Sequence, residues 1–156
     1  MKSLIKITLI ITLTLFTAVS TALAQRTIEI IGTDNMKFDV TSIEAETGEQ
    51  ITIQFTTKSQ IPKTAMAHNV VVIDKDANVD ELVMASMQAR DNDYIAPDYK
   101  DQIVAATALA GGGETVEVTF TVPQDPGQYE YVCTFPGHYQ AGMKGILTVT
   151  TSQASK

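Results

Sequence analysis

The stretch Tyr131-Val-Cys-Thr-Phe-Pro-Gly-His-Tyr-Gln-Ala-Gly-Met143 is the segment from which the rest of this chain is best interpreted. It contains the only cysteine, Cys133, one of the two histidines, His138, and a methionine, Met143, in the order Cys-x4-His-x4-Met. A thiolate, an imidazole and a thioether form a soft set of ligands, which suits copper better than hard cations. The stretch therefore predicts a metal site.

The residues around this stretch predict a loop between two strands. Phe135 precedes Pro136, which disfavours helical backbone at Phe135, and two glycines make the segment easy to bend. Residues 128–132 alternate before it, and residues 146–150 are rich in β-branched side chains after it. We expect the ligands to lie where one strand ends and the next begins.

The remainder of the chain predicts short strands, glycine and proline turns and a single helix. Asn78 is a candidate helix cap, because the acidic Glu81 lies three residues after it. Apolar residues then recur at helical spacing, so we expect a helix from Asn78 to about Ala89. Residues 90–101, which include Pro97, are expected to connect elements. Many strands with one helix indicate an all-β sandwich. The expected strands lie at 27–31, 37–40, 51–55, 69–73, 103–104, 114–122, 128–132 and 146–150.

The first residues resemble an export signal. Lys2 and Lys6 precede an apolar run from Ile7 to Val19, and Ala22-Leu-Ala24 offers small residues for cleavage before Gln25. We expect residues 1–24 to be a signal peptide and residues 25–156 to be one domain, in a periplasmic or otherwise exported protein. An uncleaved N-terminal membrane anchor is the alternative.

Charge and cysteine content narrow the classes of function. Without residues 1–24, which hold two lysines and no acid, the chain has 9 basic and 18 acidic residues. This balance argues against nucleic acid as a partner. A lone cysteine cannot form an internal disulfide, and the neighbouring His138 and Met143 favour a metal ligand over a buried, inert thiol.

Several segments resemble a known family. Cys133-Thr-Phe-Pro-Gly-His138, Met143-Lys-Gly145 and Ala67-His68-Asn69 resemble the azurin and auracyanin group of blue copper proteins, the cupredoxins. The resemblance continues through residues 35–38, 93–97, 109–114 and 116–120. It implies a Greek-key β-sandwich, the cupredoxin fold, with one inserted helix, so that residues 25–156 form a plastocyanin/azurin-like copper-binding domain.

The resemblance also implies a ligand set for one type 1 copper ion. In such proteins the ion is held in a trigonal arrangement, here by His68, Cys133 and His138, with Met143 as a weak axial ligand. Ala67 stands where azurin has a glycine whose carbonyl approaches copper, so Ala67 is a candidate for a weak backbone ligand. The resemblance further implies that backbone N–H groups of Asn69 and Phe135 point at the Cys133 sulfur, and that the Asn69 side chain ties the two ligand segments together.

The function implied is that of an exported, monomeric carrier of single electrons, and not an enzyme. Its partners are expected to be redox proteins, a donor and an acceptor of the cytochrome, oxidase or reductase class, that dock transiently near His138, whose ring reaches the surface in this family. An apolar collar is expected there, formed by Pro136, Tyr139, Ala141, Met66 and Met143. A copper-binding carrier or chaperone without a redox role is the alternative, and a sandwich that has lost copper is a third.

Overall fold

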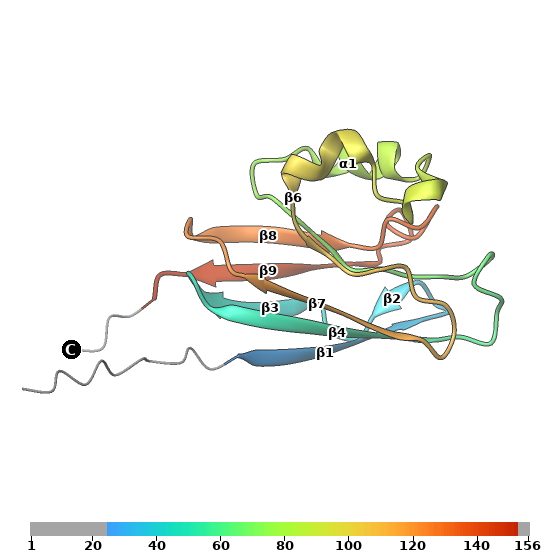
Figure 1. Ribbon diagram of the computed structural model, residues 1–156, viewed down its shortest axis with the longest axis horizontal. Helices are drawn as coiled ribbons and strands as arrows, with labels where there is room; N and C mark the ends of the chain where they lie inside the picture. The colour runs from blue at the N-terminus through green and yellow to red at the C-terminus, as the bar shows by residue number, and fades with distance from the viewer. Residues whose placement is uncertain (1–24, 153–156) are drawn as a thin grey trace, which may run out of the picture.

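The computed structural model describes residues 25–152, so the expected signal peptide lies outside the described residues. Two β-sheets pack face to face (Figure 1). The first sheet has the strand order β2-β1-β4-β7, and the second has the order β3-β9-β8-β5-β6. The strands are β1 (Arg26–Thr33), β2 (Lys37–Phe38), β3 (Ser42–Glu46), β4 (Gln50–Lys58), β5 (Val71–Ile73), β6 (Ile103–Ala106), β7 (Thr115–Thr121), β8 (Gly127–Val132) and β9 (Lys144–Thr150).

The strand order confirms the predicted Greek-key sandwich. Consecutive strands repeatedly cross between the sheets, as β4 to β5 and β7 to β8 do. Both sheets are mixed, because β1 pairs with β4 and β3 with β9 in parallel while the other pairs are antiparallel. Alternating residues of both sheets point into one core, and the large buried side chains there include Ile30, Phe55, Val72, Tyr131 and Leu147.

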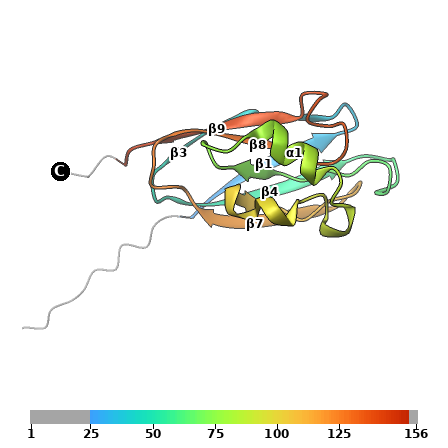
Figure 2. The same ribbon diagram turned by 90° about the horizontal axis from the view of Figure 1, so that it is seen from above.

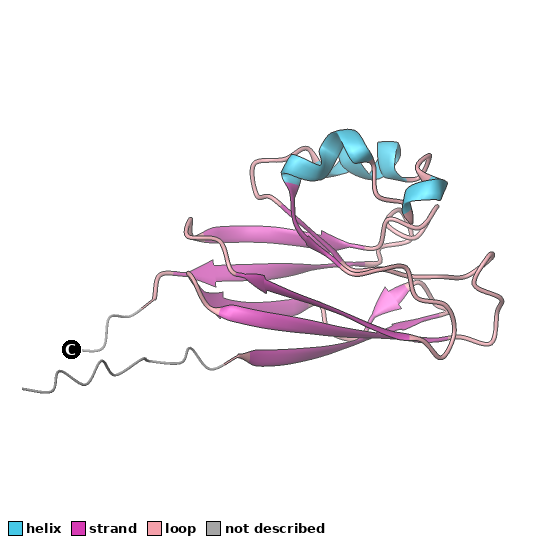
Figure 3. Cartoon of the chain, viewed as in Figure 1, coloured by secondary structure: helices cyan, strands magenta, loops and turns pink. Residues whose placement is uncertain are grey.

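One α-helix, α1 (Val79–Ser86), covers the outer face of the five-stranded sheet (Figures 1 and 3). Asn78 caps it as predicted, since its side chain accepts a hydrogen bond from the Glu81 backbone N–H. Leu82 and Val83 are buried in a second cluster with Val71, Ile73 and Val132. The helix therefore packs on the side of β5 opposite to the main core.

The helix is shorter than predicted, and the connecting segment after it is more regular than predicted. Helical residues stop at Ser86, and two short 3-10 helices follow, η1 (Arg90–Asn92) and η2 (Pro97–Gln102). Asp93 and Tyr94 have φ angles of 52° and 58°, and these left-handed residues separate the two 3-10 helices. Pro97 begins η2, where its fixed φ is tolerated.

The loops at one end of the sandwich come from distant parts of the chain. Strands β1, β4 and β8 run towards this end. Figure 2 shows from above that α1 lies over the sheet. The 3-10 helix η1 lies between α1 and η2 in the chain, and η2 leads into β6 at the opposite end of β5. We call this end the metal pole and define it by residues 33–37, 58–69, 89–94, 107–115 and 133–144. Within residues 25–152, no helix is long and apolar enough to cross a membrane.

Candidate metal centre

Strand pairing brings the two distant ligand segments together. His68 lies three residues before β5, and Cys133 directly follows β8, which pairs antiparallel with β5 through Val71 and Val132. An isolated bridge between His68 and Ala110 fixes the backbone of His68 through two hydrogen bonds, of 2.9 and 2.8 Å. His68 and Cys133 are therefore positioned by the sheet and not by their own loops.

The hairpin between β8 and β9 closes the loop that carries His138 and Met143. Val132 pairs with Lys144, and the Cys133 N–H donates to the Met143 carbonyl at 3.1 Å. Inside the loop the Met143 N–H donates to the His138 carbonyl at 3.0 Å. The loop thus returns Met143 to the level of Cys133.

Three side chains converge in a buried cluster. The Cys133 Sγ lies 3.4 Å from Nδ1 of His138 and 3.9 Å from Nδ1 of His68, and the two Nδ1 atoms are 3.0 Å apart. A triangle with these edges has corners about 2 Å from its centre, which is the length of a metal–nitrogen bond in proteins. The donor atoms are therefore spaced to surround one metal ion.

Burial sets the protonation of all three groups. Burial lowers the pKa of His68 to about 4, against the opposing charge of Asp34, and it lowers the pKa of His138 to about 4 with a further contribution from His68. Both imidazoles are therefore neutral at pH 7, and each can offer a nitrogen lone pair. Burial raises the pKa of the Cys133 thiol to about 12, against hydrogen bonds from the backbone of Asn69 and Phe135.

The chemistry of this donor set fits copper. A thiol, two neutral imidazoles and a neighbouring thioether are soft or borderline ligands, and no carboxylate belongs to the cluster. Nε2 of His68 is buried and has no hydrogen-bond partner among residues 25–152. The ring is therefore held on its Nδ1 side, by the contacts with His138 and Cys133.

Asn69 joins the two ligand segments as predicted. Its Oδ1 accepts a hydrogen bond from the Thr134 N–H at 2.9 Å, and its Nδ2 donates to Thr134 Oγ1 at 2.9 Å. Both residues have no exposed surface. The backbones of Asn69 and Phe135 lower the pKa of the Cys133 thiol against the effect of burial, in agreement with the prediction that their N–H groups point at the sulfur. The residue after each ligand thus holds the other ligand's segment in place.

Aromatic rings shield the cluster from water. The Phe135 ring packs on His138 with 4.8 Å between centroids, and Tyr94 packs on Phe135 at 4.9 Å. His138 is only 3% exposed, so its ring does not reach the surface as widely as expected. Its neighbours Pro136 and Gly137 are exposed instead.

The other predicted site residues have distinct places. Met143 is fully buried, and its backbone hydrogen bond places it beside Cys133. Ala67 is fully buried directly before His68 and has no positive φ. Tyr139 is not part of an open collar, because it packs in the cluster beneath α1.

Two contributors to the site could not be found from the sequence. Thr134 is the partner of Asn69, 65 residues away, and Lys37 donates to the ligand loop at Ala141, 104 residues away. No local sequence pattern predicts contacts between residues so far apart in the chain. Lys37 belongs to a segment that resembles azurin, but that resemblance assigns it no role.

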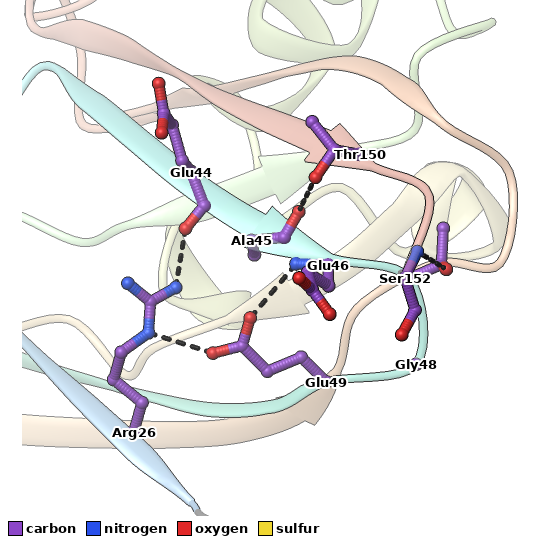
Figure 4. Close-up of a pocket in the computed structure, with 9 residues that line it drawn as sticks. Arg26, Glu44, Ala45, Glu46, Gly48, Glu49, Thr150 and Ser152 are labelled. Carbon is purple, nitrogen blue, oxygen red and sulfur yellow. Dashed lines mark hydrogen bonds and ion pairs between the residues drawn. The ribbon is translucent and has the colours of Figure 1, made fainter. Parts of the chain in front are cut away.

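A hollow lies at the end of the sandwich opposite to the metal pole, where β1 and β4 begin and β3 and β9 end. Figure 4 shows the residues that line it. It has a volume of about 760 Å³, and Arg26 crosses it to pair with Glu49 at 2.8 Å. The second carboxylate oxygen of Glu49 accepts the Glu46 N–H at 3.0 Å. The charged groups of Arg26 and Glu49 are thus used in holding strand ends together, and the hollow has no histidine or cysteine. Its lining is Arg26, Glu44, Ala45, Glu46, Thr47, Gly48, Glu49, Thr150 and Ser152.

Comparisons with known proteins agree with this donor set. The family model described as copper binding proteins, plastocyanin/azurin family, matches residues 24–150. Azurin from Pseudomonas aeruginosa is 36% identical over 130 residues, which cover 81% of this chain and 86% of that protein. Auracyanin-A from Chloroflexus aurantiacus is 38% identical over 117 residues, which cover 74% of this chain and 68% of that protein.

A solved structure supports the same comparison. The structure of auracyanin A, described as a blue copper protein from the same green thermophilic photosynthetic bacterium, superposes with a TM-score of 0.72 at 36% sequence identity. The match covers 81% of this chain and 100% of that chain.

Proposed function

Because the chain belongs to the plastocyanin/azurin family of copper-binding proteins, we propose that His68, Cys133 and His138 hold the one type 1 copper ion of a blue copper electron carrier. The observation that supports this ligand set is the convergence of one sulfur and two Nδ1 atoms within 4.8 Å of one another. Met143 is proposed as a weaker fourth ligand, and the carbonyl of Ala67 as a fifth. A crystal structure of the copper-loaded protein measures both distances directly.

Copper bound at this site supplies a one-electron redox couple. The residues of the chain keep the geometry constant, because two buried side chains, Asn69 and Thr134, lock the segments that carry His68 and Cys133. Phe135 and Tyr94 exclude water, and the backbone N–H groups of Asn69 and Phe135 stabilise negative charge on the Cys133 sulfur. A rigid, dry site needs little rearrangement when an electron arrives or leaves.

The metal pole is the proposed docking surface for redox partners of the cytochrome, oxidase or reductase class. Its five segments carry five bases and four acids, whereas the other described residues carry three bases and fourteen acids. The pole is therefore close to neutral on a strongly acidic molecule. A transient partner with a small, weakly charged face fits this surface near His138. A strongly basic partner is instead attracted to the acidic surface outside the metal pole.

Small redox complexes test this charge distribution. We expect electron exchange with an anionic complex such as ferricyanide to change little with ionic strength, because the pole through which it exchanges is near neutral. A steep acceleration by salt, of the kind that the whole net charge predicts, contradicts the proposed docking surface.

Export and a monomeric state are parts of the same proposal. The leader pattern of residues 1–24 supports cleavage before Gln25. Mass spectrometry of the protein recovered from its native compartment shows whether residues 1–24 have been removed. A mass that retains the leader supports the N-terminal anchor instead.

The alternative is a copper carrier or chaperone without a redox role. Such a protein needs ligands that exchange readily, whereas Cys133 has no exposed surface and His138 is 3% exposed. Both histidines of the chain are already used in the cluster, so no second histidine-based metal centre is available for catalysis. Electron transfer without catalysis therefore fits the site better.

A visible absorption spectrum tests the proposal. Adding Cu(II) to the protein that begins at Gln25 is expected to give an intense blue band that bleaches with ascorbate and returns on oxidation without loss of copper. The Cys133→Ser variant is expected to lose the band, and Met84→Ala, on the exposed side of α1, is expected to keep it. Colourless protein with one bound copper ion overturns the blue copper assignment and favours the carrier.

A further inference from the structure

In the loop between His138 and Met143, the Ala141 carbonyl has its hydrogen-bond partner outside the loop. Within the loop, the Ala141 N–H donates to Gly137 at 3.0 Å and the Gly142 N–H donates to Tyr139 at 2.8 Å. The Ala141 carbonyl takes part in neither bond. It accepts a hydrogen bond from Nζ of Lys37, which lies 104 residues earlier.

Lys37 reaches this loop from the other sheet. It is the first residue of β2 and pairs with Thr33 of β1, so its side chain spans from the four-stranded sheet to the loop of the five-stranded sheet. A Cβ atom added at Gly142 would lie 2.6 Å from Nζ of Lys37. The ammonium therefore sits directly over Gly142, whose φ of 88° already favours glycine.

The same β1–β2 hairpin also contacts Met143. A Cβ atom added at Gly32, the partner of Phe38 in the hairpin, would lie 3.0 Å from Cε of Met143. The hairpin thus touches the end of the loop at two points, the Ala141 carbonyl and the Met143 methyl group. Ala141 is two residues before Met143, so both contacts lie on the same short segment of the loop.

We propose that Lys37 is a positioning residue for the copper centre, which holds the Ala141 carbonyl so that the Met143 thioether keeps one distance from the site. This inference rests on the proposed copper site. The ammonium also places a positive charge beside the loop, and such a charge disfavours the more highly charged Cu(II) form. The position of the Met143 thioether and the charge of Lys37 both act on the reduction potential of the copper, and the positive charge raises this potential.

A matched pair of variants separates the effect of the hydrogen bond to Ala141 from the effect of the lysine charge. Lys58, at the end of β4, pairs with the same Thr33 from the other side of β1, is exposed, and makes no ion pair among residues 25–152. Lys37→Met removes the loop contact and a charge, Lys58→Met removes only a neighbouring charge, and Lys37→Arg restores a donor. Both altered positions, Lys37 and Lys58, are exposed, so folding should be retained in all three variants.

The first measurement uses the metal-free protein. We expect the amides of Gly142 and Met143 to exchange with solvent about fivefold faster in Lys37→Met, the population change that one ordinary hydrogen bond provides. Lys37→Arg and Lys58→Met should exchange as the parent does. This readout does not depend on copper, so its failure is distinct from a failure of the proposed function.

The second measurement uses the copper-loaded protein. Lys37→Met is expected to lower the reduction potential more than Lys58→Met does and to change the copper hyperfine splitting, while Lys37→Arg stays close to the parent in both. If Lys37→Met and Lys58→Met behave alike in amide exchange and in potential, Lys37 is only a surface charge and the proposal is wrong.

Discussion

Asn69 shows how much of this site depends on single residues that bind no metal. Its side chain makes two hydrogen bonds of 2.9 Å to Thr134, and its backbone lowers the pKa of the Cys133 thiol. All these groups are buried, so no water can replace a lost partner. Removing one side chain here therefore affects both stability and ligand geometry.

Asn69→Ala is expected to lower the free energy of unfolding of the metal-free protein by about 1–3 kcal/mol, because the buried Thr134 N–H loses its acceptor. Urea unfolding measures this change. Asn35→Ala, at an exposed turn position, is the control and should change little. Equal stability of both variants contradicts the role given to Asn69, as does an unchanged reduction potential in Asn69→Ala.

Glu114 is an exposed residue whose charge makes stability depend on pH. Hydrogen bonds from Lys63 and from the Gly111 N–H hold the pKa of its carboxyl below the usual 4.5. A carboxyl with a lowered folded pKa stabilises the protein above its unfolded pKa, and this contribution disappears as pH falls through the folded pKa.

Glu114→Gln is therefore expected to lower stability at pH 7 by only a few tenths of a kcal/mol, since the pair is solvent-exposed. At a pH below the lowered folded pKa of Glu114, the difference from the parent should vanish, because both side chains are then neutral. Thermal unfolding at the two pH values measures it, with Glu46→Gln as an exposed carboxyl without an ion pair among the described residues. A deficit that persists at low pH indicates a steric and not an electrostatic cause.

At the scale of elements, α1 acts as a cover for the outer face of the five-stranded sheet. Its buried residues Leu82 and Val83 contact β5 and the end of β8, directly before Cys133. Tyr139 of the ligand loop packs into the same cluster, and burial, together with Asp80 of the helix, raises the pKa of its hydroxyl. The helix thus supports the back of the metal site without supplying a ligand.

Leu82→Ala is expected to cost about 2–5 kcal/mol, because it leaves a cavity in a fully buried cluster. Met84→Ala on the same helix is the control, since Met84 is 56% exposed and should change stability by less than about 0.5 kcal/mol. Chemical denaturation of both variants measures the difference. If their costs are similar, α1 is not packed as described.

At the scale of the whole molecule, the metal site connects parts of the chain that only folding brings together. His68 belongs to the segment before β5, and Cys133 and His138 belong to the last hairpin. An unfolded chain presents no such triangle of donors. Metal binding is therefore linked to global stability.

Cu(II) in excess is expected to raise the free energy of unfolding by about 4 kcal/mol when its free concentration is about 1,000 times the dissociation constant. Calorimetry with and without copper measures the gain, and a chelator should reverse it. Cys133→Ser should gain much less, because the thiolate is lost. If copper stabilises the parent and Cys133→Ser equally, the ion is bound at a site that does not include Cys133.

Local patterns allowed most of the fold to be predicted. Alternation marked the long strands, and the Asn78 cap marked the start of α1, because both signals act over a few residues. The 3-10 helices could not be predicted. They depend on the left-handed Asp93 and Tyr94, which contacts with Asn69 and Phe135 hold in place.

The sequence by itself determined the ligand loop, because Cys133, His138 and Met143 lie within eleven residues and Pro136 and Gly137 dictate its bend. The tertiary structure alone decided how close His68 comes to that loop, that His138 is almost buried, and that Lys37 reaches Ala141. The physical reason is the distance along the chain over which each interaction acts. Turn chemistry acts between chain neighbours, whereas these contacts follow from how strands pair and how the two sheets stack across the core.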